Sequence, residues 1–268
     1  MSVDFSAVLD SMRPAPPGML VIVPSDWLQG RTAFGGMQAA IAVRAMREAL
    51  PVEVRSLPLR AAQTTFIGPV PGRVEIHAQA VVLRVGRSTC HARCDLLHEG
   101  KVVCSVIGVF GAPRASVFVK ELPRPNPGVG PEDCLPTFGG EAAPAFVQHI
   151  EQRWAHGSAP FSGAAEPRSM IYVRLKDKRC EPEHALVALA DAVPTPVLSV
   201  FDRPTPAVSL NWMLEILRDP KLLDLEAWVL IDTDVRAGTD GYLSQTSVLY
   251  GADGHAYSVS HQTVGVFG

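Results

Sequence analysis

Asp191 is the residue best placed for chemistry, because it is an aspartate within an apolar segment. Residues 183–193 read EHALVALADAV, so most neighbours three and four positions from Asp191 are apolar. Burying a carboxylate there is costly unless it has partners, and the end of a helix disfavours negative charge. A desolvated carboxylate has a raised pKa and is a better base. We predict a general base at Asp191; alternatively, its side chain points to solvent from the last helical turn.

Gln262 is a second candidate, in a segment that alternates like a strand. It shares one face with Ser258, Ser260, Val264 and Val266. A neutral amide can orient a water molecule because it donates and accepts hydrogen bonds at once. A glutamine in a strand is, however, usually a solvated surface residue.

Ser209 and Asn211 are weaker candidates, since they lie opposite an apolar face. Val208, Leu210 and Trp212 alternate with them along residues 207–217. The apolar residues are expected to cover a helix, which places Ser209 and Asn211 on the other face of the strand. They serve a site, with Asn211 as a candidate for substrate binding, only if that face meets the other half of the chain. A shift of one residue would put Val208 in place of Ser209.

Gly35 and Gly36 begin an apolar segment and are candidates for a different chemical role. Backbone amides at a helix N-terminus lack partners and favour negative charge. Near a reacting carbonyl they would stabilise an oxyanion. The alternative is that the two glycines only permit close packing of a helix against a sheet.

The elements that position these residues occur twice. In the first half, a short strand at residues 20–23 precedes a buried helix at Gly35–Ala49, and four strands follow at residues 55–66, 73–83, 88–97 and 101–110. In the second half, a strand at 171–175 and a helix at 183–193 precede strands at residues 207–217, 226–235, 242–250 and 255–267. Both halves end in Val-Phe-Gly.

The repeat predicts an α+β protein in which a sheet wraps around a helix twice, because one curved sheet cannot bury its own concave face. Two such units can pair edge to edge; one large α+β domain with a coincidental repeat is the alternative. Residues 112–170 hold nine of the 23 prolines and read as an extended connection with one short helix near residues 145–154. We expect domains at 1–111 and 171–268, joined by this connection. Asp191, Ser209 and Gln262 correspond by the repeat to positions near Ala40, Pro58 and Ser105. The first half therefore lacks these three polar residues, and we expect one site per chain.

Composition excludes several classes of function. The 268 residues carry a net charge of −3, which argues against nucleic-acid binding. No apolar run approaches the roughly 20 residues of a membrane span, the N-terminus lacks the features of a signal peptide, and we expect a cytoplasmic location. The five cysteines lack the spacing of a zinc site, so we expect reduced thiols and no metal. There is no nucleophile elbow, phosphate loop or dinucleotide fingerprint.

Several modest motifs are similar to those of the double hot-dog acyl-CoA thioesterases, the bacterial type II enzymes and the broader thioesterase-like superfamily. They are Ala-Phe-Gly-Gly at 33–36, an aromatic–x–x–Pro ending at 66–69, Leu-Ala-Asp at 189–191, Ser-Leu-Asn at 209–211 with arginine at 218, and His-Gln at 261–262. The resemblance covers residues 20–111 and 171–268. It implies a tandem (double) hot-dog fold and hydrolysis of an acyl-CoA thioester.

The resemblance also implies roles for the candidate residues. Asp191, Ser209 and Gln262 match the aspartate, threonine or serine, and glutamine that hold the attacking water in that family. The sequence departs from the family at Asn211, commonly aspartate, and at Trp212, often histidine. Coenzyme A enters only as part of the substrate, without a further cofactor, and a homodimer of double units is expected. The alternatives are a hot-dog hydratase or dehydratase with an aspartate–histidine pair, and a protein that binds acyl-CoA without turnover.

Overall fold

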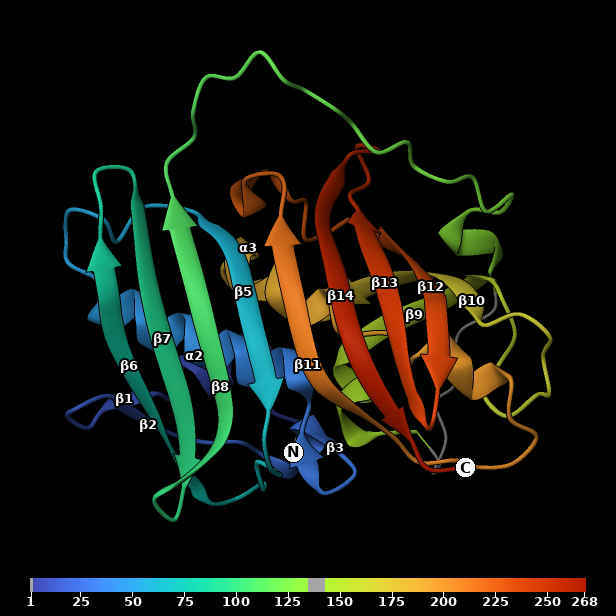
Figure 1. The fold of residues 1–268 in the computed structure, drawn as a ribbon, viewed down its shortest axis with the longest axis horizontal. Coiled ribbons are helices and arrows are strands. Elements are labelled where there is room, and N and C mark those ends of the chain that lie inside the picture. Colours follow the sequence, from blue (N-terminus) through green and yellow to red (C-terminus); the bar gives the residue numbers. More distant parts are fainter. Residues whose placement is uncertain (1, 135–142) are drawn as a thin grey trace.

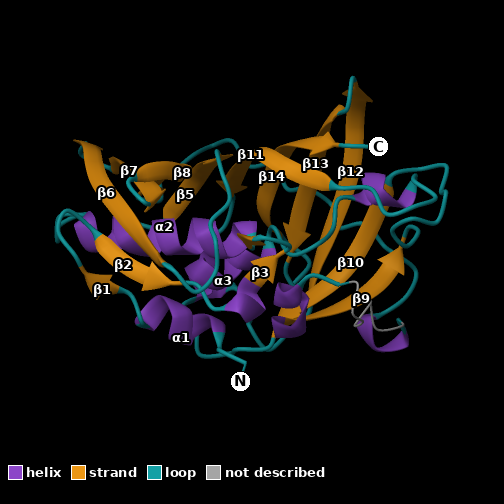
Figure 2. Ribbon diagram, turned by 90° about the horizontal axis from the view of Figure 1, so that it is seen from below, coloured by secondary structure: helices purple, strands orange, loops and turns teal. Residues whose placement is uncertain are grey.

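A computed structural model describes residues 2–134 and 143–268. One twelve-stranded antiparallel sheet curves around two helices that lie side by side on its concave face (Figures 1 and 2). The α-helices are α1 (Phe5–Asp10), α2 (Gly35–Ala49) and α3 (Pro182–Leu189). Short 3-10 helices occupy Ser25–Trp27, Pro131–Asp133, Ala145–His149, Pro196–Ser199 and Pro220–Leu222.

The strands fall into two sets, one on each side of the pair β5–β11. The first set is β1 (Arg13–Pro14), β2 (Met19–Ile22), β5 (Leu59–Phe66), β6 (Glu75–Val85), β7 (Thr89–His98) and β8 (Lys101–Gly111). The second set is β9 (Ile150–His156), β10 (Arg168–Leu175), β11 (Ala207–Ile216), β12 (Val229–Thr239), β13 (Tyr242–Tyr250) and β14 (Ala256–Val266). A separate ribbon pairs β3 (Leu28–Gln29) with β4 (Thr32–Ala33).

The two sets have the same internal order, as the repeat in the sequence predicts. The sheet runs β1-β2-β6-β7-β8-β5-β11-β14-β13-β12-β10-β9, so β2-β6-β7-β8-β5 on one side corresponds to β10-β12-β13-β14-β11 on the other. Strands β5 and β11 join the two halves edge to edge (Figure 1). The expected α+β architecture, with a sheet wrapped around a helix in each half, is confirmed.

The connection between the halves contributes a strand to the sheet. The short helix expected near residues 145–154 is a 3-10 helix at Ala145–His149, followed at once by β9. Strand β9 pairs with β10 and forms the outer edge of the second half. Part of the segment expected as a plain connection therefore belongs to the sheet, while the division at residues 111 and 170 stays a prediction.

Helix α2 is buried because its residues are small and apolar nearly all round. Its predicted bounds agree with the structure, and Ala39, Ala40, Ile41, Ala42 and Val43 are fully buried. Helix α3 is shorter than predicted and ends at Leu189. After it, the N–H groups of Asp191 and Ala192 donate to carbonyls three residues back, so the chain leaves the helix through a tight turn. Asp191 thus lies just beyond the helix.

Helices α2 and α3 run antiparallel and are tied together at one end by an ion pair. Arg47, in the last turn of α2, pairs with Glu183, in the first turn of α3, and both side chains are mostly buried. The Arg47 guanidinium also donates to the carbonyl of Leu57, and Glu183 accepts the N–H of Leu59. Each charge also suits the dipole of its own helix. The pair therefore links the two halves across their helices.

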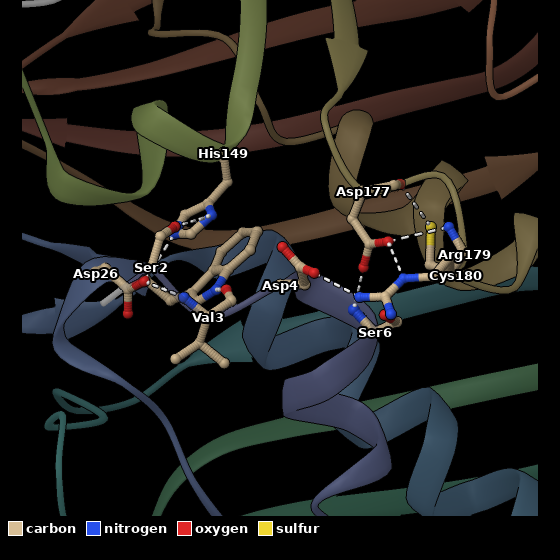
Figure 3. A network of polar contacts seen from close by, with 10 residues as sticks. Ser2, Val3, Asp4, Ser6, Asp26, His149, Asp177, Arg179 and Cys180 are labelled. Carbon is tan, nitrogen blue, oxygen red and sulfur yellow. Dashed lines mark hydrogen bonds and ion pairs between the residues drawn. The ribbon is translucent and has the colours of Figure 1, made fainter.

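The N-terminal segment is held by contacts to the second half, to the first half and to the connection (Figure 3). The Asp177 carboxylate accepts the backbone N–H of Ser6 at 2.7 Å and that of Arg179 at 3.0 Å. The backbone N–H of Val3 donates to Asp26, and the ring of His149 stacks on Trp27 with centroids 4.0 Å apart. Contacts of this kind fix α1 beneath the two central helices (Figure 2).

Candidate functional site

Asp191 and Gln262, singled out in two separate segments of the sequence, are in direct contact. The side-chain amide of Gln262 donates from Nε2 to Oδ1 of Asp191 at 2.7 Å. Asp191 follows α3, and Gln262 stands on the concave face of β14 with only 9% of its surface exposed. The two residues thus form a buried polar pair where the sheet meets the end of the helix, although their catalytic roles stay predictions.

The N-terminus of α2 faces the same carboxylate, so both halves of the chain build the site. The backbone N–H of Gly36 donates a hydrogen bond to Asp191. A Cβ added at Gly35 would lie 2.5 Å from Oδ2 of Asp191 and 3.0 Å from the ring of Phe66. Glycine at 35 is therefore required for the close approach of the carboxylate to the helix end.

The orientation of Asp191 resolves the electrostatic conflict seen in the sequence. A carboxylate near the end of its own helix meets an unfavourable dipole. Here the carboxylate instead points at the N-terminus of α2, where Gly36 offers a free N–H and the dipole favours negative charge. The opposite running directions of α2 and α3 make this arrangement possible.

Burial gives Asp191 the ionisation expected of a general base. Desolvation raises its pKa from the ordinary value of 3.8 to about 7, while the hydrogen bonds from Gln262 and Gly36 act in the opposite direction. The carboxyl is surrounded by protein, yet the residue keeps some accessible surface. Near neutral pH the group can therefore both accept and hold a proton.

Ser209 faces the site because β11 is irregular, whereas Asn211 faces away from it. Ser209 pairs with Val264 and Asn211 pairs with Thr263, with a bulge between the two positions. Paired residues share a face of the sheet, and Val264 shares the face of Gln262. The expectation that Ser209 and Asn211 lie together on the outer face is thus wrong for Ser209, because a bulge re-aims a side chain.

Neither residue makes a side-chain hydrogen bond within the described parts of the chain. Ser209 is half-buried and pairs with Val264, two residues from Gln262 along β14, and its assignment as a water-holding residue stays a prediction. Asn211 is exposed on the convex face, opposite Thr65 of β5. The structure does not bring Asn211 to the site, and its assignment to substrate binding stays a prediction without support from this geometry.

The two glycines differ in what their amides can do. The N–H of Gly36 already serves Asp191, so the oxyanion role expected of it has a competing partner. Gly35 is also in the first turn of α2, where N–H groups have no partner within the helix. Stabilisation of an oxyanion by Gly35 stays a prediction.

Gln245 belongs to the site and was missed from the sequence. It stands on β13 directly opposite Gln262, and its Nε2 donates to Oε1 of Gln262 at 2.6 Å. A hairpin centred on the turn at residues 252–254 places these two glutamines opposite each other, so the register of the predicted strands could have found it. The site is therefore a chain of three side chains: Gln245, Gln262 and Asp191.

A metal site or a membrane span would place specific requirements on the described residues. No group of three or more histidine, cysteine, aspartate or glutamate side chains within residues 2–134 and 143–268 is arranged to hold a metal ion. Over the same residues, none of the helices has the length and apolar character needed to cross a membrane. The carboxyl of Asp191, with a pKa of about 7, is chemically capable of proton transfer near neutral pH.

Comparisons with family models identify both halves. The model for the acyl-CoA thioesterase C-terminal domain matches residues 131–266, and the model for the N-terminal domain matches residues 23–111. Among curated proteins, none matches this sequence.

Solved structures with a similar fold include a conserved protein with a hot-dog fold from Alicyclobacillus acidocaldarius, 23% identical over 100% of this chain and 99% of that chain, with a TM-score of 0.87. An acyl-CoA thioesterase II from Mycobacterium marinum is 15% identical over 98% of both chains, with a TM-score of 0.76. The dehydratase domain of PpsC from Mycobacterium tuberculosis is 14% identical over 96% of this chain and 97% of that chain, with a TM-score of 0.55. These similarities establish the double hot-dog fold.

Proposed function

This chain belongs to the acyl-CoA thioesterase family and is a thioester hydrolase, and we propose that it hydrolyses an acyl-CoA by direct attack of a water molecule that Asp191 activates. The observation on which this rests is the hydrogen-bonded pair of Asp191 and Gln262 at the N-terminus of α2. A carboxylate with a pKa near neutral is suited to act as a general base at physiological pH.

The reaction needs one water molecule and no covalent intermediate. Asp191 removes a proton from water as the water oxygen attacks the carbonyl carbon of the thioester. The carbon–sulfur bond then breaks, coenzyme A leaves as a thiolate, and the proton held by Asp191 returns to the thiolate through solvent. The products are a carboxylic acid and free coenzyme A, so atoms and charge balance.

The amides around Asp191 support this step in two ways. Gln262 uses one N–H for Asp191 and one lone pair for Gln245, which leaves its second N–H and second lone pair for the water. Ser209, turned inward by the bulge, supplies a hydroxyl on the same face. The N–H of Gly35 is the candidate donor to the oxygen of the tetrahedral intermediate.

A hydratase or dehydratase is the competing enzyme class, since one structural neighbour is a dehydratase domain. A hot-dog hydratase or dehydratase is expected to pair a histidine with the aspartate, so that alternative needs a histidine close to Asp191 in space. Within the described residues, the only side-chain partner of Asp191 is Gln262. Hydrolysis is therefore better supported than reversible addition of water to a double bond.

Release of free thiol from acyl-CoAs of increasing chain length tests the proposal. Wild type is expected to turn over a range of chain lengths, and Asp191→Asn to lose at least about a hundredfold in kcat, as loss of a general base predicts. Asp234→Asn, which changes an exposed carboxylate on β12, is the matched control. Full activity of Asp191→Asn would exclude Asp191 as the base, whereas tight binding without hydrolysis by wild type would favour a binding protein.

We propose a homodimer of double units, which sedimentation at several protein concentrations checks directly. A cytoplasmic location stays a prediction.

A further inference from the structure

Gln245 is buried where the fold alone gives no reason for a polar residue. Only 4% of its surface is exposed, and it lies on the concave face of β13, which packs toward the core. Its Oε1 is buried without a hydrogen-bond partner among the described residues. An unpaired buried carbonyl oxygen is costly, so an apolar side chain at this position would cost less if packing were its only task.

When Asp191 is ionised, Gln245, Gln262 and Asp191 can form their two hydrogen bonds with only one arrangement of donors and acceptors. A carboxylate can only accept, so Gln262 must turn Nε2 toward Asp191. The Oε1 of Gln262 then faces Gln245, which donates to it from Nε2. Without this donor, the amide of Gln262 is free to rotate and to present its oxygen to the carboxylate, where two acceptors repel each other.

We propose that Gln245 is a positioning residue that fixes the amide of Gln262 in the orientation that donates to Asp191. It acts only through Gln262 and has no contact with substrate. The proposal rests on the proposed function of Asp191 as the base. It also accounts for the unpaired Oε1 of Gln245, because the amide must point its nitrogen at Gln262 and its oxygen is left in the core.

Gln245→Met separates this role from a structural one. Methionine has a similar length and no donor, so it removes the hydrogen bond without leaving a cavity. The variant leaves Oε1 of Gln262 unpaired but removes the unpaired Oε1 of Gln245, so one buried amide oxygen is unpaired in either protein. Its thermal unfolding is therefore expected to match that of wild type.

Catalysis is expected to change even though folding does not. At neutral pH, kcat should fall about tenfold, the effect of one lost hydrogen bond in the reacting geometry, with KM unchanged. The lower limb of the pH–rate profile should move to higher pH, because Asp191 loses part of the donation that favours its ionised form. In a Gln262→Met background, Gln245→Met should change kcat less than about twofold, since its effect passes through Gln262.

Thr246→Val is the matched control, because Thr246 is the next residue on β13 and its side chain contacts His261 on the convex face. It is expected to leave kcat and the pH profile unchanged.

Titration of the Asp191 carboxyl by carbon-13 NMR gives a readout that does not require turnover, with Asp191→Asn identifying the signal. A raised pKa of Asp191 in Gln245→Met, or in Gln245→Leu if the methionine variant does not fold, supports the proposal. An unchanged pKa, or an undiminished effect of Gln245→Met in the Gln262→Met background, overturns it. If Asp191→Asn abolishes hydrolysis while Gln245→Met matches wild type, the role of Gln245 fails and the role of Asp191 stands. If Asp191→Asn remains active, the proposed function itself fails.

Discussion

Replacing Asp191 with asparagine should abolish activity and yet stabilise the protein. The native pKa of Asp191 is about 7, above the ordinary value of 3.8. Between these values the folded protein binds a proton that the unfolded chain does not, so this group lowers the free energy of unfolding as the pH rises. The cost of the buried charge is fully present above about pH 7 and absent below about pH 4.

The size of the effect follows from the difference between these two pKa values. A rise from 3.8 to about 7 corresponds to at most about 4 kcal/mol, at about 1.36 kcal/mol for each tenfold change in the ionisation constant. An asparagine at this position would not replace the carboxylate fully, because one side-chain oxygen must serve both Gln262 and Gly36, and a lost hydrogen bond costs about 1 kcal/mol. The accessible surface of Asp191 reduces the gain further. We therefore expect Asp191→Asn to gain roughly 1 to 3 kcal/mol at pH 8.

Urea unfolding of wild type and Asp191→Asn at pH 5 and pH 8 provides the measurement. The difference in the free energy of unfolding should be larger at pH 8 than at pH 5. Asp234→Asn serves as the control, since its exposed carboxylate predicts no comparable gain. Equal stability of Asp191→Asn and wild type at both pH values, or a variant less stable at pH 8, would show that the buried charge of Asp191 does not destabilise the fold.

Three further predictions concern the mechanism and the joint between the halves. Rapid-quench measurements should show thiol release without a burst and no acyl group attached to the protein; a burst with an acyl adduct would indicate a covalent route. Gly35→Ala should lower kcat at least about tenfold because its Cβ would displace the Asp191 carboxylate, whereas Gly68→Ala, with only ordinary contacts, should remain active. Arg47→Met should lower the free energy of unfolding by about 3 kcal/mol in a denaturant titration, because it leaves the Glu183 carboxylate largely unpaired; an unchanged midpoint would contradict the importance of that pair.

Elements set by local pattern were predictable from the sequence. Helix α2 and strand β13 have the predicted bounds, and β8 differs by one residue, because apolar periodicity and the flanking turn residues act over short distances. The internal repeat predicted that the two halves share one strand order, but not the order itself, in which β5 pairs with β8 and β11 with β14. Strand β9 was not predictable in this way, since it is extended through pairing with β10 at the sheet edge and its own sequence resembles a short helix.

The site was predictable residue by residue but not in its detailed geometry. Asp191 stood out because its charge conflicts with its surroundings, and Gln262 because of its similarity to a family motif. The inward turn of Ser209 depends on a bulge of one residue, which alternation along the strand cannot reveal. The contact between Asp191 and the N-terminus of α2 joins residues far apart in the sequence and required the antiparallel arrangement of the two helices.

The pH dependence of hydrolysis, compared with the titration of Asp191 in the same protein, tests the central claim most directly. If Asp191 activates the water, kcat/KM rises with pH through a single ionisation near 7, and carbon-13 NMR gives the same pKa for the Asp191 carboxyl. A carboxyl pKa near the ordinary value of 3.8, or hydrolysis that does not follow the ionisation of Asp191, would contradict the claim that this residue activates the water.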